Sequence, residues 1–354
     1  MKRFSVRIIN EVKSMASIKD VARLAGVSIS TVSRVINNHP NVSDEKRKVV
    51  KKAIKELNYV PNALAQGLVT NSTNSIGILI ADIVNDFYSI LVRSVEDVLN
   101  QKGYFTIIGN TDWKEEKEKN YINYFMQKQV DGFILASTTL ENSYINKIGD
   151  NFPVVVLDRN IKSDIIDRIR VDDYKGGYKA TEHLVNQGYK KILHLQGPQG
   201  IVSAEDRKKG FIQCLKDKGI SSSEYDVIQG CYMEKCGYKA IGKYFKKNNI
   251  NGSKDIKKSI GVFAANDAMA FGLLKYLKQK NINCPQKIGV VGFDNVNFAD
   301  YSSPPLTTIK RPIKKVGRIA ANILIDRLDQ EKDHFRQSIT LDVKLIERNS
   351  TKFH

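Results

Sequence analysis

The sequence predicts a small all-α helix-turn-helix domain followed by an α/β body of two lobes, each built on a doubly wound parallel sheet. Two observations indicate this fold class. Three short amphipathic helical patterns precede Leu57, and β-branched runs alternate with helical stretches from about Ser75 to Phe293. With 354 residues, of which 42% are hydrophobic, the chain is long enough to bury more than one core.

The first three helical patterns are short and narrow, as expected for a three-helix domain. They cover Ile18–Ala25, Ser28–Ile36 and Asp44–Leu57. Ser28 and Ser43 are placed as N-caps, because a serine oxygen can accept one of the first unpaired backbone N–H groups of a helix.

A glycine turn joins the first two patterns. Gly26 can take the positive φ of a sharp turn without steric cost. Ala22 and Gly26 are also small enough to let the two helices pack closely. A helix, a short turn and a second helix at this spacing are typical of a helix-turn-helix.

The second helix presents a small polar face. When Val32 and Val35 turn inward, Ser30, Arg34 and Asn37 point outward. In a DNA major groove, arginine can donate two hydrogen bonds to guanine, and asparagine can pair with adenine. The alternative is a solvated helix face without a partner, but the glycine turn and the basic charge of this region favour DNA.

Positive charge is concentrated at the start of the chain. Lysine and arginine number 56 against 38 acidic residues, which gives a formal charge of +18. Residues 1–72 hold 13 basic and 5 acidic residues, so a fifth of the chain carries +8 and forms a basic end. A polyanionic partner is therefore favoured.

In the body, each short apolar run is expected to be a strand and each longer amphipathic stretch a helix. The runs are "SIGILIAD", "YFTIIG", "DGFILAS", "PVVVLD", "KKILHLQG", "SIGVFAAN" and "KIGVVGF". The helical stretches are Phe87–Lys102, Lys114–Lys128, Tyr174–Gln187, Asp267–Lys280 and Ile313–Asp329. Continuous apolar runs imply parallel strands covered on both faces, and their number implies two lobes with a ligand cleft at the carboxyl ends of the strands. The last strand-like segment, "SITLDVKLIERNS", implies that the chain recrosses between the lobes.

Other classes of function find little support. Cys214, Cys231, Cys236 and Cys284 form no CxxC pair and lie near no histidine at metal-ligand spacing, which indicates incidental thiols of a reduced cytosolic protein. No signal-peptide core and no run of about 18 apolar residues occurs, so a cytoplasmic location without a membrane segment is expected. GxGxxG, GxxxxGK(S/T), GxSxG and HExxH are absent, so no enzymatic activity, metal or cofactor is expected.

Several motifs together resemble one known family. "SIKDVARLAGVSISTVSRVINN", followed by "VSDEKRKVVKKAIKELNYVPNALAQGL", is similar to the headpiece of the lactose-repressor/galactose-repressor (LacI/GalR) family of bacterial transcription regulators. "VDDYKGGYKATEHLVNQGYKKILHLQGP" and "ANDAMAFGLL" extend the resemblance through the body. It covers nearly everything from Ala16 to the last strand, and it implies a periplasmic-binding-protein-like effector domain.

The resemblance also implies domain boundaries. They are an N-terminal extension over 1–15, a headpiece over 16–61, a hinge helix and linker over 62–74, and an effector-binding and dimerisation domain over 75–354. The first lobe would comprise about 75–171 and 312–338, and the second about 172–310 and 339–354. The extension lies outside the family pattern and is either an upstream start assignment or a basic arm that adds phosphate contacts.

The DNA-binding residues implied by the resemblance lie on the second helix and in the hinge. They are Ser28, Ile29, Ser30, Thr31, Ser33, Arg34, Asn37, Asn62, Ala65 and Leu68. In this family the hinge becomes a helix only on DNA, and its leucine, here Leu68, wedges into the minor groove. A helix of about seven residues that contains Gly67 is marginal alone, which agrees with this expectation.

The resemblance also implies an effector site in the cleft. Its candidates are Asn85, Phe87, Tyr88, Asp158, Arg159, Ser203, Arg207, Tyr232, Asn266, Phe293 and Asp294. Carboxylates and guanidinium groups can satisfy neighbouring hydroxyls, and aromatic faces can cover a sugar ring, so a sugar or sugar derivative is expected. Asp86 stands where the family often has proline, and Asp173 and Asp267 are expected to cap helices instead.

These features predict a sequence-specific repressor of carbohydrate-utilisation genes whose operator binding is controlled by a sugar-like effector. One recognition helix reads only a few base pairs, so a homodimer on a palindromic double-stranded operator is expected. Three alternatives stay open: a corepressor-dependent regulator, a regulator controlled by a protein partner, and a sugar-binding transport protein. The last would need a signal peptide and would carry no DNA-binding headpiece.

Overall fold

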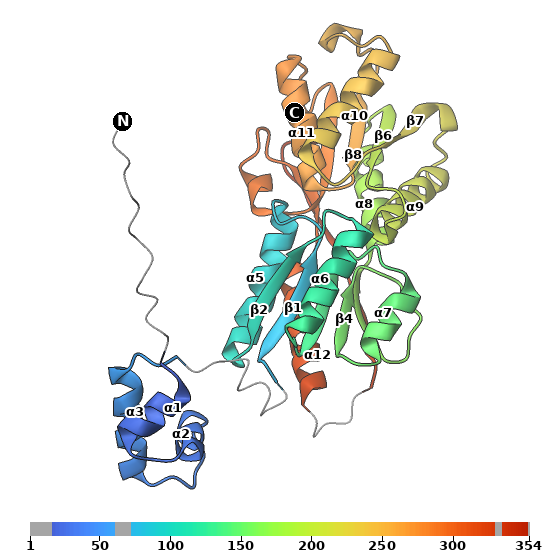
Figure 1. Ribbon diagram of the computed structural model, residues 1–354. Coiled ribbons are helices and arrows are strands. Elements are labelled where there is room, and N and C mark those ends of the chain that lie inside the picture. The colour runs from blue at the N-terminus through green and yellow to red at the C-terminus, as the bar shows by residue number, and fades with distance from the viewer. Residues whose placement is uncertain (1–15, 61–71, 330–334, 353–354) are drawn as a thin grey trace, which may run out of the picture. The chain divides into compact units, whose positions relative to one another are not determined.

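The computed structural model describes residues 16–60, 72–329 and 335–352. Its contacts divide the chain into two units, Met1–Thr73 and Asn74–His354, and each unit has a hydrophobic core of its own. Figure 1 shows the helices of the first unit and the two lobes of the second.

The described part of the first unit confirms the three predicted helices. They are α1 (Ile18–Ala25), α2 (Ile29–Ile36) and α3 (Asp44–Glu56). Val21, Val32 and Val50 are fully buried where the three helices meet. This core is small because each helix contributes only a narrow apolar stripe, which leaves most of the helix surfaces exposed.

The ends of these helices confirm some of the predicted details and correct others. Ser28 caps α2 by accepting a hydrogen bond from the Thr31 backbone N–H, whereas Ser43 precedes α3 without a side-chain capping bond. Gly26 takes a φ of +65°, as predicted, but a Cβ at this position would meet open space. Gly26 is therefore needed for its backbone conformation rather than for close packing, and the buried small residue between the helices is Ala22.

The second unit is built on two six-stranded sheets. The first sheet, entirely parallel, has the order β11 (Ser338–Leu341), β5 (Asp167–Val171), β4 (Val154–Leu157), β3 (Gly132–Ala136), β1 (Ser75–Ile80), β2 (Phe105–Asn110). The second has the order β12 (Lys344–Ile346), β10 (Thr307–Lys310), β9 (Ile288–Asp294), β8 (Ile260–Ala264), β6 (Lys191–Gln196), β7 (Tyr225–Gln229). Only β12 runs antiparallel to its neighbour.

Helices pack on both faces of each sheet, which confirms the predicted doubly wound architecture. Those of the first lobe are α5 (Asp86–Gln101), α6 (Glu115–Gln127), α7 (Asn142–Gly149) and α12 (Ile313–Leu328). Those of the second are α8 (Asp173–Asn186), α9 (Val202–Asp217), α10 (Glu234–Lys247) and α11 (Asp267–Gln279), with short 3-10 turns at Ser222–Glu224, Ser253–Asp255 and Asn297–Asp300. In β1, Ile78 packs with the core under α5 and α12, while Leu79 packs on the opposite face with α6 and α7, so the whole strand is apolar.

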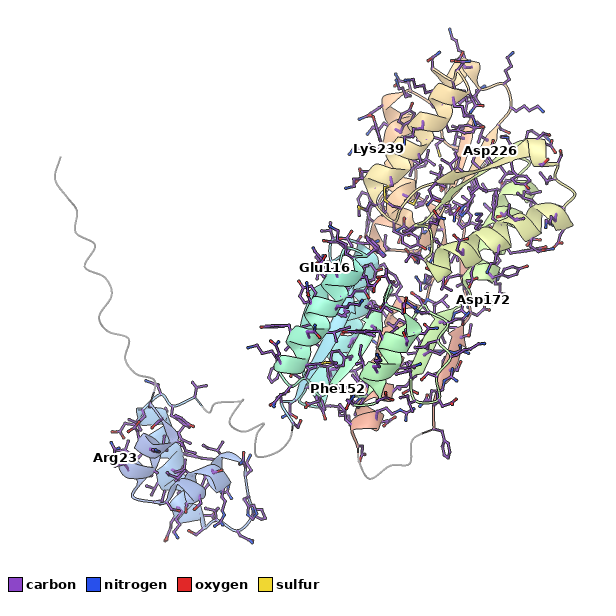
Figure 2. The ribbon with its side chains drawn as sticks, turned by 45° about the vertical axis from the view of Figure 1, so that its right-hand side comes forward. Arg23, Glu116, Phe152, Asp172, Asp226 and Lys239 are labelled. Carbon is purple, nitrogen blue, oxygen red and sulfur yellow. A yellow bond between two sulfur atoms is a disulfide. The ribbon has the colours of Figure 1, made fainter. Side chains whose placement is uncertain are left out.

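The chain passes between the two sheets after β5, after β10 and after β11. The predicted last strand is in fact two strands, because β11 pairs with β5 in the first sheet and β12 pairs with β10 in the second. The recrossing expected after residue 338 therefore comes after Leu341. Figure 2 shows Asp172, the residue after β5, at the level where the lobes meet.

Three strands were missed by the sequence patterns, namely β5, β7 and β10. They span only four or five residues each. In β5, charged and apolar residues alternate, and β7 is a half-exposed edge strand, so neither shows the continuous apolar run of the central strands. Only contacts distant in sequence reveal these strands.

The expectation of four incidental thiols is wrong for two of the cysteines. Cys231, just after β7, and Cys236, in the first turn of α10, form a disulfide with their Cα atoms 5.7 Å apart. The strand end and the helix start converge here, although the residues lack CxxC spacing. Cys214 and Cys284 are free.

We predict that the unfolded, non-reduced protein presents two reactive thiols rather than four, as counted with a thiol reagent. Replacing both Cys231 and Cys236 with serine is expected to lower the free energy of unfolding by about 2 kcal/mol, because a short cross-linked loop limits the entropy of the unfolded chain. The variant Cys284→Ser, measured beside it by urea unfolding, should keep the disulfide. Four reactive thiols in the wild type would contradict this pairing.

Candidate functional site

The first candidate site is the outer face of α2. Ser28, Ser30, Arg34 and Asn37 are exposed, and Ile29 keeps 45% of its surface open to solvent. No ion pair or side-chain hydrogen bond holds Arg34 among the described residues, so all its guanidinium donors are free. This face combines free donors with an exposed apolar side chain.

The remaining DNA-binding candidates are less exposed or lie elsewhere. Thr31 and Ser33 are half-buried on α2, and the Ser28 hydroxyl lies 2.8 Å from that of Thr31. Three further candidates, Asn62, Ala65 and Leu68, lie outside the described residues, as do residues 1–15.

The second candidate site lies at the carboxyl ends of the strands of both lobes. Nine of the eleven predicted effector residues line one cavity of about 20 Å³. The nine are Asn85, Phe87, Tyr88, Asp158, Ser203, Arg207, Tyr232, Asn266 and Asp294, and Ser137 and Arg311 join them. Open α/β sheets bind ligands at the carboxyl ends of their strands, and here residues distant in sequence meet at that edge.

A buried cluster of two arginines and three aspartates forms the wall of this cavity. Arg311, which follows β10, donates from Nη2 to both carboxylate oxygens of Asp158 at 2.6 Å. Arg207 donates from Nε to Asp173 at 2.8 Å. Asp294 Oδ1 lies 3.5 Å from Arg311 Nη1 and 3.9 Å from Arg207 Nη2. Because Asp158 belongs to the first sheet's lobe and Arg311 follows the second sheet, their ion pair bridges the lobes.

Aromatic rings hold both guanidinium groups in place. Arg311 lies 4.5 Å from the centre of the Phe87 ring, and Arg207 lies 3.7 Å from that of Phe293. The Tyr232 ring is 5.5 Å from Arg207, and its hydroxyl lies 3.1 Å from that of Ser203. Cation–π contacts of this kind fix the orientation of an arginine that ion pairs alone would leave free to rotate.

Burial shifts the electrostatics of the cluster. It raises the pKa of Asp294 to about 6, although Arg207 and Arg311 oppose the shift. Burial also disfavours the charge of Arg311, but Asp158 and the other two aspartates outweigh it and raise the pKa of this arginine. The guanidinium groups therefore stay charged, while Asp294 titrates within an accessible pH range.

Two buried polar atoms of the cluster, Asp294 Oδ1 and Arg311 Nε, have no hydrogen-bond partner within the described ranges. An unsatisfied buried polar group costs about 1–3 kcal/mol. One atom is an acceptor and the other a donor, so a ligand hydroxyl could satisfy either. Both atoms can therefore accept a polar ligand as a partner.

Two effector candidates lie outside the cavity, and two predicted helix caps have other roles. Arg159 turns away and donates from Nη1 to the Thr138 carbonyl at 3.0 Å. Phe293 is fully buried beneath Arg207 and supports the site rather than lining it. Asp173 and Asp267 are not caps, because the preceding residues, Asp172 and Asn266, cap α8 and α11.

Asp267 instead accepts hydrogen bonds in the interior of the second lobe. Thr308 Oγ1 donates to it at 2.6 Å, and the Val296 backbone N–H donates at 2.9 Å. Asn266 combines two roles, since its Oδ1 caps α11 and its Nδ2 donates to the Tyr232 carbonyl at 3.0 Å. The cap therefore also holds the segment that carries Tyr232.

Sequence reasoning missed Ser137 and Arg311. A signal for both was available, because Ser137 ends the run "DGFILAS" and directly follows β3, and Arg311 directly follows the short strand β10. Residues in this position lie at the carboxyl edge of a parallel sheet, where ligands bind.

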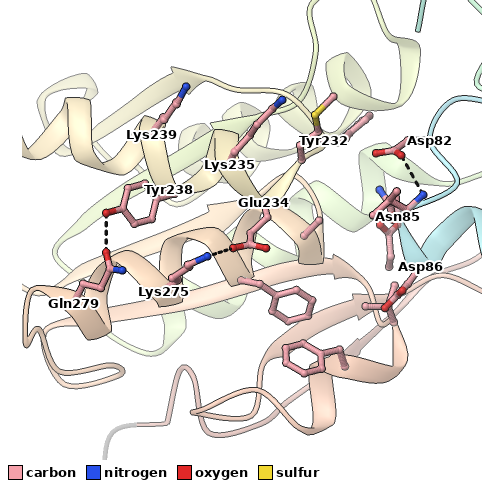
Figure 3. Close-up of a pocket in the computed structure, with 17 residues that line it drawn as sticks. Asp82, Asn85, Asp86, Tyr232, Glu234, Lys235, Tyr238, Lys239, Lys275 and Gln279 are labelled. Carbon is pink, nitrogen blue, oxygen red and sulfur yellow. Dashed lines mark hydrogen bonds and ion pairs between the residues drawn. The ribbon is translucent and has the colours of Figure 1, made fainter. Parts of the chain in front are cut away.

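A wider groove opens from this cavity over the second lobe (Figure 3). Its volume is about 760 Å³, and it shares Asn85, Tyr232 and Asp294 with the inner cavity. The groove runs along α10 and α11, which contribute Lys235 and Lys275 among other side chains. Sequence reasoning predicted none of the α10 and α11 residues that line the groove.

The described parts of the chain show neither a metal site nor a membrane-spanning helix. No group of three or more histidine, cysteine, aspartate or glutamate side chains is arranged to hold a metal ion there. Nor does any helix in those parts have the length and apolarity needed to span a membrane.

The chain matches two family models and a full-length relative. Residues 17–62 match the lacI family of bacterial regulatory proteins, and residues 181–351 match a periplasmic binding protein-like domain. The HTH-type transcriptional repressor PurR of Vibrio atlanticus (strain LGP32) is 35% identical over 340 residues, which cover 96% of this chain and 99% of that protein.

Solved structures agree in fold. The lac repressor dimer bound to operator and the anti-inducer ONPF is 27% identical, with a TM-score of 0.79 over 95% of this chain and 99% of that one. The complex of the transcriptional regulator CelR with cellobiose is also 27% identical, with a TM-score of 0.69 over the same shares of the two chains. From its two domains and its 35% identity to a repressor that it covers over 99% of the length, the chain belongs to the LacI family of bacterial regulatory proteins.

Proposed function

We propose that this protein is a repressor that binds a palindromic operator as a homodimer and releases it when a sugar-like effector occupies the cleft between its lobes. The observation that carries the proposal is the pairing of a free, exposed arginine face on α2 with an incompletely satisfied polar cluster between the lobes. In this proposal the protein acts in the cytoplasm by binding DNA and catalyses no reaction.

The DNA-reading role rests on the chemistry of α2. Arg34 has free donors for the O6 and N7 atoms of guanine, and Asn37 can pair with adenine. Ile29 is exposed and can contact a thymine methyl group. Asn62, Ala65 and the minor-groove wedge assigned to Leu68 remain predictions of the family resemblance. The lac repressor, a relative in fold, was solved as a dimer on its operator.

The effector role rests on the Asp/Arg cluster. Asp294 Oδ1 and Arg311 Nε offer an acceptor and a donor to the hydroxyls of a polyol. CelR binds cellobiose in a related fold. A ligand that rearranges the Asp158–Arg311 bridge would change how the lobes are held, and it would shift the DNA affinity by its differential affinity for the two arrangements.

A corepressor, which strengthens DNA binding, is the second candidate. The same site could act with either sign, because the geometry of the cleft does not depend on which state binds DNA. Fluorescence anisotropy of labelled operator DNA, titrated with monosaccharides, disaccharides and their phosphates, decides between the two. A panel in which no compound alters operator affinity would remove the effector role and favour control by a protein partner.

We expect the variant Arg34→Ala to reduce the preference for operator over scrambled DNA by roughly 5- to 150-fold, which corresponds to about 1–3 kcal/mol for a lost bidentate base contact. The measurement is a competition gel shift with both DNAs. The exposed Lys51→Ala on α3 is the control, since loss of a phosphate contact weakens binding to both DNAs alike. An equal loss on both DNAs for Arg34→Ala would contradict base readout.

We expect effector binding to weaken as the pH falls below about 6. The pKa of Asp294 is raised to about 6, so its carboxylate is ionised above that pH and protonated below it. An ionised carboxylate accepts a hydroxyl more strongly, so affinity should fall up to about tenfold for each pH unit below the pKa. The compound that changes operator affinity most in the anisotropy panel serves as the probe.

The variant Asp294→Asn should bind that probe more weakly at neutral pH and lose the pH dependence. The conservative control is Asp255→Asn, an exposed carboxylate on the same lobe far along the sequence from the cluster. A pH profile that is unchanged in Asp294→Asn would show that another group controls binding.

A further inference from the structure

The net charge of the chain is concentrated in two segments, not only at its start. Residues 231–287 contain twelve lysines, no arginine and three acidic residues, which gives +9 of the total +18. Residues 1–72 carry +8, so everything else is nearly neutral. The second basic segment contains α10 and α11, whose outer side in the second lobe Figure 2 marks with Lys239.

The acidic residues of this segment offset only part of its positive charge. Burial raises the pKa of Asp267 to about 8, so this residue is largely neutral near pH 7. Glu234 pairs with Lys275 at 2.9 Å, so these two charges cancel each other. Asp255 accepts backbone hydrogen bonds from Asn251 at 2.8 Å and Gly252 at 3.1 Å and does not line the groove. The groove of about 760 Å³ is lined by three lysines, Lys235, Lys239 and Lys275, and by four carboxylates, Asp82, Asp86, Glu234 and Asp294, so its unpaired positive charge lies on the α10 wall.

Two lysines of the groove wall are free. Lys235 and Lys239 are exposed, lie one helical turn apart on α10, and make no ion pair or hydrogen bond within the described residues. Figure 3 shows their ammonium groups pointing the same way along one wall, beside the Glu234–Lys275 and Tyr238–Gln279 pairs. Two parallel free ammonium groups suit a single anion with several oxygens.

The wall that carries Lys235 is held in a fixed shape. The Cys231–Cys236 disulfide closes a loop around Tyr232, Met233, Glu234 and Lys235, all of which line the groove. On the other side, Phe271 and Phe298 form an edge-to-face pair with ring centres 5.0 Å apart, and 52% of Phe298 is exposed. An exposed aromatic pair offers an apolar surface to a sugar ring.

The two ends of the groove differ in the charge of their side chains and in the volume open to a ligand. Asp82, Asp86 and Asp294 line its inner end, where carboxylates can accept sugar hydroxyls. The inner cavity beyond them, of about 20 Å³, has room for little more than one water molecule. The groove has the volume of a typical small-molecule site, on the order of 300–1,000 Å³.

We propose that the groove extends the effector site and takes the phosphate end of a phosphorylated disaccharide. The phosphate lies between Lys235 and Lys239, one sugar ring lies against Phe271 and Phe298, and the other directs its hydroxyls to Asp294. This inference rests on the proposed effector function and names its ligand class. The carboxylates at the inner end of the groove and the lysines on α10 determine which end of the ligand binds at each end of the groove.

Isothermal titration calorimetry on the full chain tests this with cellobiose 6-phosphate, cellobiose and inorganic phosphate. The phosphorylated sugar should bind at least roughly tenfold more tightly than cellobiose, since hydrogen bonds to charged groups contribute more than neutral ones. The double variant Lys235→Gln/Lys239→Gln should lose most of that preference. The matched control is Lys243→Gln/Lys247→Gln, which removes the same charge from exposed positions of α10 that do not line the groove.

Different results would contradict the phosphate site and the effector function. Equal binding of cellobiose and its phosphate, or an unchanged preference in Lys235→Gln/Lys239→Gln, overturns the phosphate site but leaves a sugar effector intact. Equal losses in both double variants show general attraction of anions to a basic face, which also overturns it. If inorganic phosphate binds as tightly as the sugar phosphate, the sugar rings contribute nothing to binding and the proposed ligand class is wrong. If none of the sugars tested binds, the effector function itself is contradicted.

Discussion

Two buried guanidinium groups set against three buried carboxylates hold the centre of this molecule together. Charges removed from water are costly unless each is paired, and Arg311 and Arg207 meet that requirement through Asp158 and Asp173. Asp294 is left with the weakest contacts. Because the Asp158–Arg311 pair joins residues that follow strands of different sheets, the same interaction that stabilises the interior also sets how the lobes meet. One cluster thus links the packing of the interior to the contact between the lobes.

The sequence patterns succeeded where burial on both faces leaves a continuous apolar run or a clear helical stripe. They therefore predicted the three small helices, the central strands and five helices of the body, α5, α6, α8, α11 and α12, but not α9 (Val202–Asp217) or α10 (Glu234–Lys247). They failed for β5, β7 and β10, because short strands with mixed composition owe their pairing to neighbours distant in the chain. Disulfide pairing of Cys231 with Cys236 depends on the same kind of distant geometry.

The candidate site followed the same logic. The family resemblance implied eleven effector candidates, and nine of them line the cavity. Strand ends do not predict side-chain direction, so Arg159 turns to the Thr138 carbonyl while Arg311, which no pattern singled out, enters the centre. Charge totals mislead in a similar way, since the overall +18 conceals two separate basic regions with different neighbours.

The adjacent strands β11 and β12 have a consequence for how the protein is made. One completes the edge of the first sheet and the other completes the edge of the second, and only two residues separate them. The first sheet cannot be completed before Leu341 is translated, nor the second before Ile346, whereas the helices of residues 18–56 can fold early in synthesis. Until these strands are made, β5 and β10 are unpaired edges of the two sheets, so the nascent chain is open to misassociation at both edges.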